Sequence, residues 1–484
     1  MSQSSTERAR AFASQYHTYR GLPPLAGLGS FSEAVEPGLS VEESVRRLKA
    51  AHYAFKRLHE IFLARLTAEP VYELKMAFSL HAHLCAEHVA ALRARVGEMR
   101  EPPLGLDQIP HRAPALIFDE ILAAPTTSEL LLGLYEIVLP ALRNVLERHR
   151  AAAHVLAEQP TRRMLKFALL EVDEMLTYGR AAVSALVAPE QRAAAEPGLG
   201  TLMATLAAAG GLDGLGTAPL PPRHHSAHPH SYQRVPQRDS RFPDPYNMGV
   251  NAEVFLYDPT LPADGKVLMM FYKRLREIDV PEMMSSIITE THGKPWGYYR
   301  DMTRQLWDEA RHAMMGEVGF VSVGVDWPRE VMVNFTWSHS LNTQLTPKER
   351  HAVLYFIEQG LMPKTGKRHE WEVAVQSANP LAATFQDFDW ADEVLHARVG
   401  RDWYVKDMPS AHEAVAYGDH CWSKVLLDWG AWKRSGQTGH RNWWPGLYTQ
   451  YCSRNQVTPD PEALAYQTNY EKVRADLRDI SASG

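Results

Sequence analysis

Residues 306–313 read LWDEARHA, and residues 390–397 read WADEVLHA. Each stretch contains the pattern Asp-Glu-x-x-His, with its Glu-x-x-His pair at 309–312 in the first and at 393–396 in the second. Because helical residues three apart lie on one face, each pair directs a carboxylate and an imidazole toward the same point. One such pair is common by chance in a helical chain, whereas two copies in amphipathic helices indicate a polar site inside a helical bundle.

The composition is that of a globular protein with more than one domain. The 484 residues exceed what one hydrophobic core usually serves, and 45% are hydrophobic against 22% charged. A net charge of −6 offers no basic surface for phosphate backbones, so nucleic acid is not an expected partner. Three cysteines are too few for a disulfide framework or a thiolate metal site.

The sequence carries no signal for a membrane. Its first residues, MSQSSTERARAF, lack the apolar core of a signal peptide. No apolar run approaches the roughly 18 residues of a membrane span. We therefore expect a cytoplasmic protein without a membrane partner.

Helical periodicity dominates the chain and predicts an all-α fold. Strand signals are few, the best being VFLYD at 254–258. The tail is rich in tryptophan and is expected to pack against the second helical domain. The predicted organisation is an N-terminal arm at 1–40, a helical domain at 41–187, a linker or crossover rich in Pro, Gly and His at 188–262, a second helical domain at 263–408 and an aromatic-rich C-terminal extension at 409–484.

Helix geometry suggests a glutamate to join the first Glu-x-x-His pair. Four-helix di-metal sites need two such pairs plus one glutamate from each of two other helices. A turn is predicted near Gly293, and Glu277 precedes it by 16 residues while Glu309 follows it by 16. With a rise of about 1.5 Å per residue, the two carboxylates lie level across an antiparallel hairpin. Glu282, nearer the turn, is the alternative.

Glu358 is the choice for the third helix, which TPKE at 346–349 is predicted to begin. It precedes Glu393 by 35 residues, a spacing close to the 32 residues between Glu277 and Glu309. Burying so many carboxylates without cations would be prohibitive, which is a reason to expect metal. Glu370 and Glu372 remain alternatives to Glu358. The six predicted ligands are Glu277, Glu309, His312, Glu358, Glu393 and His396.

An aspartate precedes each ligand glutamate. A metal-bound histidine usually donates its other N–H to a carboxylate. Asp308 is therefore predicted to support His396, and Asp392 to support the other histidine, unless both are solvated charges on a helix face. Four aromatic residues near the ligand helices are predicted to pack, with cavity walls or radical relays as other roles: Tyr272, Tyr299, Trp307 and Tyr355.

The motif order over residues 265–410 resembles the ferritin-like superfamily of di-iron carboxylate proteins, most nearly its bacterial oxygenases, including the tRNA-hydroxylase type. The resemblance implies a four-helix bundle in which the six residues named above bind two Fe ions. Carboxylate and imidazole ligands also suit an Mn/Fe or di-manganese pair. The resemblance further implies O₂ as co-substrate.

The sequence of the first half resembles a degenerate copy of the second. FKRLHEI at 55–61 parallels YKRLREI at 272–278, and VDEMLTYG at 172–179 parallels ADEVLHARVG at 391–400. We therefore predict two ferritin-like four-helix bundles in tandem, the N-terminal one degenerate and serving as scaffold or as one wall of a substrate cavity. The pairing matches Glu60 with Glu277, Glu136 with Glu358 and Glu174 with Glu393, but Thr177 with His396.

The expected function is that of a di-iron or Mn/Fe oxidoreductase. It would activate O₂ for hydroxylation, desaturation or N-oxygenation of a small organic substrate. Electrons would come from an external donor, because the chain has no G-x-G-x-x-G dinucleotide motif. Two alternatives are a metal-binding protein for iron storage or peroxide detoxification and a metal-free helical interaction protein. The sequence is compatible with a homodimer.

Overall fold

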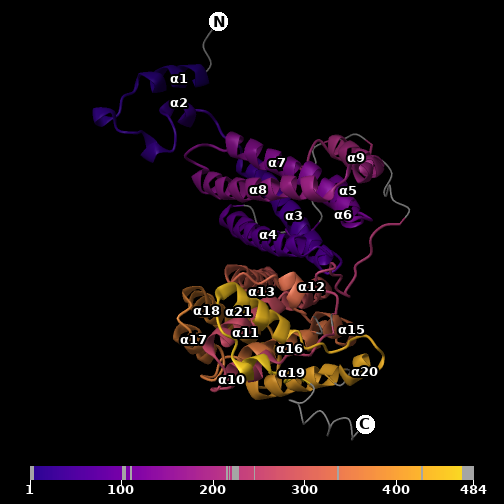
Figure 1. Ribbon diagram of the computed structural model, residues 1–484. Coiled ribbons are helices and arrows are strands. Elements are labelled where there is room, and N and C mark those ends of the chain that lie inside the picture. The colour runs from indigo at the N-terminus through magenta and orange to yellow at the C-terminus, as the bar shows by residue number, and fades with distance from the viewer. Residues whose placement is uncertain are drawn as a thin grey trace. The chain divides into compact units, whose positions relative to one another are not determined.

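The computed structural model describes residues 5–470 apart from 101–104, 109–111, 214–215, 217–218, 221–227, 245, 335–336 and 427–428. Helices are the only regular structure within these residues, so the all-α prediction is confirmed for them (Figure 1). None of the described helices combines the length and apolar character needed to cross a bilayer.

The chain divides into two compact units. The first comprises residues 1–61 and 84–231, and the second comprises residues 62–83 and 232–484. Two long helices, α3 (Val41–Leu66) and α4 (Tyr72–Glu98), therefore contribute to both. The α-helices that lie wholly in the first unit are α1 (Ser5–Gln15), α2 (Phe31–Ala34), α5 (Arg112–Leu122), α6 (Thr127–Leu132), α7 (Leu139–Ala152), α8 (Gln159–Leu186) and α9 (Pro189–Ala209), with a π-helical turn, η3 (Gly133–Val138), before α7. In this unit α7 packs on α8, and both α5 and α6 pack on α9.

Several predicted irregular segments contain helices. Part of the predicted linker is α9, which begins with Pro189 in its first turn and ends before Gly210 in the left-handed conformation. Alanine and leucine side chains form most of the buried face of this helix. The Gly and Pro content of the segment gave no indication of that face. The best strand signal, at 254–258, does not form a strand, because Asn251 caps a short helix there, α10 (Ala252–Tyr257). The predicted arm contains α1 and α2, neither of which buries a residue. Parts of the predicted linker and extension lie outside the described residues.

The second unit contains α10 and twelve further described α-helices. They are α11 (Ala263–Arg276), α12 (Asp279–Glu290), α13 (Trp296–Ser322), α14 (Trp327–Glu330), α15 (Asn342–Gln344), α16 (Pro347–Gly360), α17 (Lys367–Gln376), α18 (Pro380–Trp403), α19 (Ala411–Leu426), α20 (Trp429–Arg434), α21 (Trp444–Asn455) and α22 (Pro461–Leu464), with a π-helical turn, η4 (Trp337–Leu341). The unit is organised around α13 and α18. Both α11 and α12 pack on α13, while α16 and α17 pack on α18, and α13 also packs on α18. Thr346 caps α16 through a capping box with Glu349, as the start signal predicted.

The helix expected to run through Glu277 is broken at that residue. Helix α11 ends at Arg276, Glu277 forms its C-cap, and α12 begins at Asp279. Pro281 explains the break, because proline has no N–H to donate inside a helix. It is tolerated in the first turn of α12, where the N–H groups have no partner within the helix. The carboxylate of Glu277 is thus presented from a helix end.

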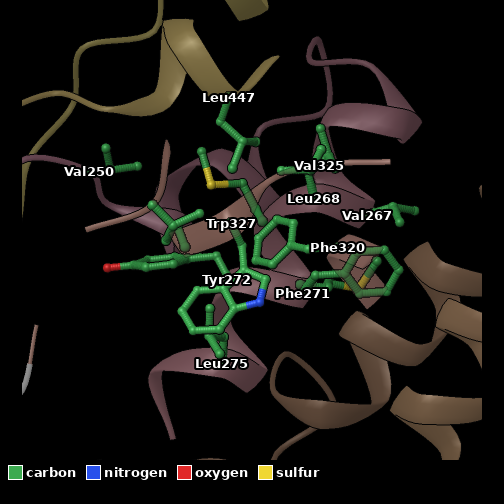
Figure 2. Packing of buried hydrophobic residues seen from close by; sticks show 14 of the residues in the cluster. Val250, Val267, Leu268, Phe271, Tyr272, Leu275, Phe320, Val325, Trp327 and Leu447 are labelled. Atoms are coloured by element: carbon green, nitrogen blue, oxygen red, sulfur yellow. The ribbon is translucent and has the colours of Figure 1, made fainter. Parts of the chain in front are cut away.

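Close packing of α11 on α13 positions Glu277, at the end of α11, relative to α13. A Cβ atom at Gly316 would lie 2.2 Å from the backbone nitrogen of Leu275, so only glycine allows this approach. Beside it, the main core of the unit includes Phe271, Phe320 and Trp327 (Figure 2). The tryptophan-rich tail joins the same core, as expected. The ring centroids of Tyr272 and Trp443 are 4.5 Å apart, and those of Phe255 and Trp444 are 4.8 Å apart.

Candidate metal centre

Two groups of ligand atoms meet where α13, α16 and α18 face the end of α11. Within each group, the ligand atoms lie within 4.8 Å of one another. Glu393 belongs to both groups, so the two are contiguous. We call them the Asp389 cluster, formed by Glu277, His312, Asp389 and Glu393, and the Glu358 cluster, formed by Glu309, Glu358, Glu393 and His396.

The two clusters bring together all six of the predicted ligands. The fallback residues lie elsewhere. Glu282 forms ion pairs of 2.8 Å with Lys75 and 2.7 Å with Arg238. Glu370 pairs with Lys273 and accepts a hydrogen bond from Gln386. Both carboxylates are held by these partners outside the clusters, and neither contributes a ligand atom to them. The third alternative, Glu372, pairs with Arg368 over 2.9 Å.

Asp389 is the cluster residue that the sequence prediction missed. It lies four residues before Glu393 on α18, and His396 lies three residues after Glu393. Spacings of four and three place all three side chains on one face of a helix. The stripe Asp-x-x-x-Glu-x-x-His was therefore visible in the sequence as an extension of the Glu-x-x-His pair.

Each cluster histidine is oriented by the aspartate predicted for it. His312 Nε2–H donates to Asp392 Oδ2 over 3.1 Å, and His396 Nε2–H donates to Asp308 Oδ2 over 3.4 Å. Because Nε2 carries the proton that is bonded to the aspartate, Nδ1 of each ring has a lone pair for a cation once the ring is neutral. The Nδ1 atoms face the clusters, 3.4 Å from Glu277 Oε2 for His312 and 3.1 Å from a Glu309 oxygen for His396.

Arginines hold the two aspartates in turn. Arg304 Nε donates to Asp308 over 2.9 Å, and Arg311 donates to both Asp308 and Asp392. These contacts neutralise the supporting carboxylates outside the clusters. The charge inside the clusters must therefore be balanced by other groups.

Four buried atoms in the clusters have no hydrogen-bond partner. They are Nδ1 of His312 and of His396, together with Oε2 of Glu277 and of Glu393. Leaving a buried polar atom unpaired costs about 1–3 kcal/mol, so four at one place call for a shared partner. A metal cation would satisfy all four at once, and carboxylate with imidazole is the donor set that suits iron and manganese. The residues present therefore fit a metal centre.

Positive charge is distributed unequally over the two clusters. Lys367 Nζ lies 2.8 Å from Asp389 Oδ1 and 2.9 Å from Glu393 Oε1. Arg274 pairs with Asp389 and, over 2.8 Å, with Glu277. Lys367 was not foreseen from the sequence. It follows an interrupted connection, and only the packing of α17 on α18 brings it to the site.

The pKa values follow this distribution of charge. Burial, followed by the carboxylates of Glu393 and Glu309, raises the pKa of Glu358 well above its usual range. Burial also disfavours the charged form of Glu277, but the nearby cations, Arg274 foremost, lower its pKa to about 2. A metal binding to the Glu358 cluster would therefore displace a proton from it.

A cavity of about 190 Å³ adjoins the clusters. Its lining includes the cluster residues Glu277, Glu309, Glu358 and Glu393 and the apolar side chains of Val280, Leu354, Ile357 and Leu361. None of the four predicted aromatic residues belongs to this lining. Tyr272 packs in the core, Tyr355 packs on Tyr404, Tyr299 donates its hydroxyl to the Thr291 carbonyl, and Trp307 packs at the edge of the core.

Comparison with family models, with curated proteins and with solved structures finds no match for this chain. Its function is therefore inferred from the residues of the two clusters and of the adjoining cavity.

Proposed function

We propose that this chain is an oxidoreductase whose two clusters hold a pair of metal ions, two irons or an Mn/Fe pair. Its reaction would be the hydroxylation, desaturation or N-oxygenation of a small organic substrate, with electrons from an external donor. When bound, the metal pair would supply reductive activation of O₂. The observation that carries the proposal is the convergence of five carboxylates and two imidazoles, with four unpaired buried atoms among them.

The chain's own residues would bind and orient the two ions. Glu393 belongs to both clusters and would help to hold both ions, while His312 and His396 would provide one imidazole each. The ring centroids of the two histidines are 5.9 Å apart, a separation that suits ligands of neighbouring ions. Asp392 and Asp308 fix the rings so that each Nδ1 faces inward before any ion arrives.

The cavity would hold the substrate. Val280, Leu354, Ile357 and Leu361 form an apolar wall that limits water beside the cluster carboxylates. Polar side chains from α11, among them Lys273 and Arg276, belong to the same lining. A cavity of about 190 Å³ suits a small molecule that has both apolar and polar parts.

For the fold, we propose that α11 with α12, α13, α16 and α18 form a ferritin-like bundle and that the first unit is a copy without ligands. One contact recurs in both units. A Cβ atom would lie 2.1 Å from the Tyr135 ring at Gly179 and 2.4 Å from the Tyr355 ring at Gly400. Each tyrosine therefore packs directly on a glycine of the neighbouring helix.

Matching these tyrosine–glycine contacts shifts the pairing of the two halves by two residues. Glu136 and Glu174, the counterparts chosen from sequence, are exposed. Burial favours the shifted pairing, because its members in the first unit are buried and apolar, as a core that binds no ion would require. The shifted pairing matches Val138 with Glu358, Val172 with Glu393 and Met175 with His396.

The test is anaerobic reconstitution with Fe(II), followed by metal analysis and exposure to O₂. We expect up to about two irons per chain and a near-UV and visible absorption change that needs both Fe(II) and O₂. His312→Ala and His396→Ala should lower the metal content, while His292→Ala, which changes an exposed histidine, should not. A folded chain that binds no iron would refute the proposal, and many irons in a large assembly would indicate storage instead.

A further inference from the structure

Lys367 occupies the interior of the Asp389 cluster. It is the first residue of α17, and its side chain is 1% exposed. Its Nζ atom lies 2.8 and 2.9 Å from the two oxygens of Asp389 and 2.9 Å from Glu393 Oε1. Three carboxylate oxygens thus surround an ammonium group in the position where ligand atoms would surround a metal ion.

Arg274 completes the neutralisation of this cluster. It pairs with Asp389 and with Glu277, and Lys367 Nζ also lies 3.9 Å from Glu277. Every carboxylate of the Asp389 cluster is therefore in contact with a lysine or an arginine. A divalent ion that enters there must compete with charges that the fold has already supplied.

Glu309 and Glu358, the two carboxylates that belong to the Glu358 cluster alone, lack such cations. Among the described residues, neither Glu309 nor Glu358 forms an ion pair with a lysine or an arginine. Glu358 accepts a hydrogen bond from the neutral amide of Gln305 over 2.9 Å, and both glutamates face the His396 ring. Two carboxylates therefore lie together without a lysine or arginine partner, and the contact of Lys367 with this cluster is limited to the shared Glu393.

We propose that the two clusters fill in a fixed order, with a divalent cation binding first at the Glu358 cluster while Lys367 holds the Asp389 cluster closed. The second ion enters only when the Lys367 ammonium withdraws. This order rests on the proposed function, because it takes both clusters to be metal sites.

The side chain of Lys367 has a place to which it can withdraw. It lines the cavity beside the clusters, and its four-carbon stem is flexible, whereas the planar guanidinium of Arg274 is fixed by two carboxylates. Separating a buried ammonium from its partners is costly, so the second ion should bind roughly a hundredfold more weakly than the first. A change of Lys367 to an uncharged residue should remove most of that difference.

The experiment is an anaerobic titration of the full chain with Mn(II), with free Mn(II) measured by its EPR signal. Wild type should bind one ion tightly and a second roughly a hundredfold more weakly. Lys367→Met should tighten the second site to within about tenfold of the first. The control is Lys364→Met, which changes an exposed lysine three residues earlier and should leave both affinities unchanged.

A second pair of variants decides the order even if Lys367→Met fails to fold. Asp389→Asn should keep the tight ion and lose the weak one, whereas Glu358→Gln should lose the tight ion. The order is overturned if wild type binds two ions equally, if the second affinity is unchanged in folded Lys367→Met, or if Asp389→Asn loses the tight ion. A wild-type chain that binds neither Mn(II) nor Fe(II) overturns the proposed function as well.

Discussion

The metal-free chain should lose stability as the pH rises above 7, because its folded state holds protons that the unfolded chain releases. Burial would lower the pKa of His312, but its hydrogen bond to Asp392 and the neighbouring glutamates raise that pKa to about 10. An unfolded histidine titrates near 6.5. The contribution of His312 is therefore complete below a pH of about 6.5 and is lost as the pH rises toward 10.

The size of the effect follows from the two pKa values. A rise from about 6.5 to about 10 corresponds to at most about 5 kcal/mol, or up to about 1.4 kcal/mol per pH unit. Glu358 acts in the same direction, because its raised pKa means that the folded state binds that proton more tightly. His351 does not interfere, because burial lowers its pKa to about 4 and its effect falls on the acid side of 6.5.

The assay is urea unfolding followed by circular dichroism at about pH 7, 8 and 9, after treatment with a chelator. The free energy of unfolding should fall by about 1 kcal/mol per pH unit. It should fall less in His312→Gln and as in wild type in His292→Gln, where the histidine is exposed. Saturating Mn(II) should reverse the trend, because metals bind deprotonated ligands. A free energy that stays constant from pH 7 to 9 in the chelated wild type would refute this reasoning.

Three further changes have separable outcomes. Gly316→Val should separate α11 from α13, cost about 1–3 kcal/mol in urea unfolding and lower the Mn(II) affinity. By contrast, Gly360→Ala, with open space around its Cβ, should be tolerated; equal effects would contradict the close approach. Asp392→Asn should weaken Mn(II) binding about 10–100-fold in an EPR titration, and an unchanged affinity would show that the aspartate does not orient His312. Glu282→Gln should destabilise the fold by about 3–5 kcal/mol because it leaves Lys75 and Arg238 with a neutral partner. Its metal content should stay at the wild-type level, and a loss of metal in the folded variant would place Glu282 in the site.

Local helical spacing accounts for most of what could be predicted about the site. The two Glu-x-x-His pairs and the equal distances of Glu277 and Glu309 from the turn depend only on residues near each other in sequence. Sequence spacing could not choose between Glu277 and Glu282. That choice depends on Arg238, which pairs with Glu282 from a segment more than 40 residues away.

Tertiary packing decides the features that were missed. Lys367 reaches the site only because α17 packs on α18 after a connection interrupted by Pro363 and Gly366. The spacing of hydrophobic residues in the sequence gives no information about such a contact. The tyrosine–glycine contact found in each unit was likewise invisible in the sequence, because it joins residues of different helices.

Crystals grown with Mn(II) and measured above and below the manganese absorption edge would test most directly whether the clusters bind metal. We predict an anomalous peak enclosed by Glu309, Glu358, Glu393 and His396, with a weaker peak or none beside Asp389. The contrary result is a second unit without any anomalous peak, in which Lys367 alone bridges Asp389 and Glu393.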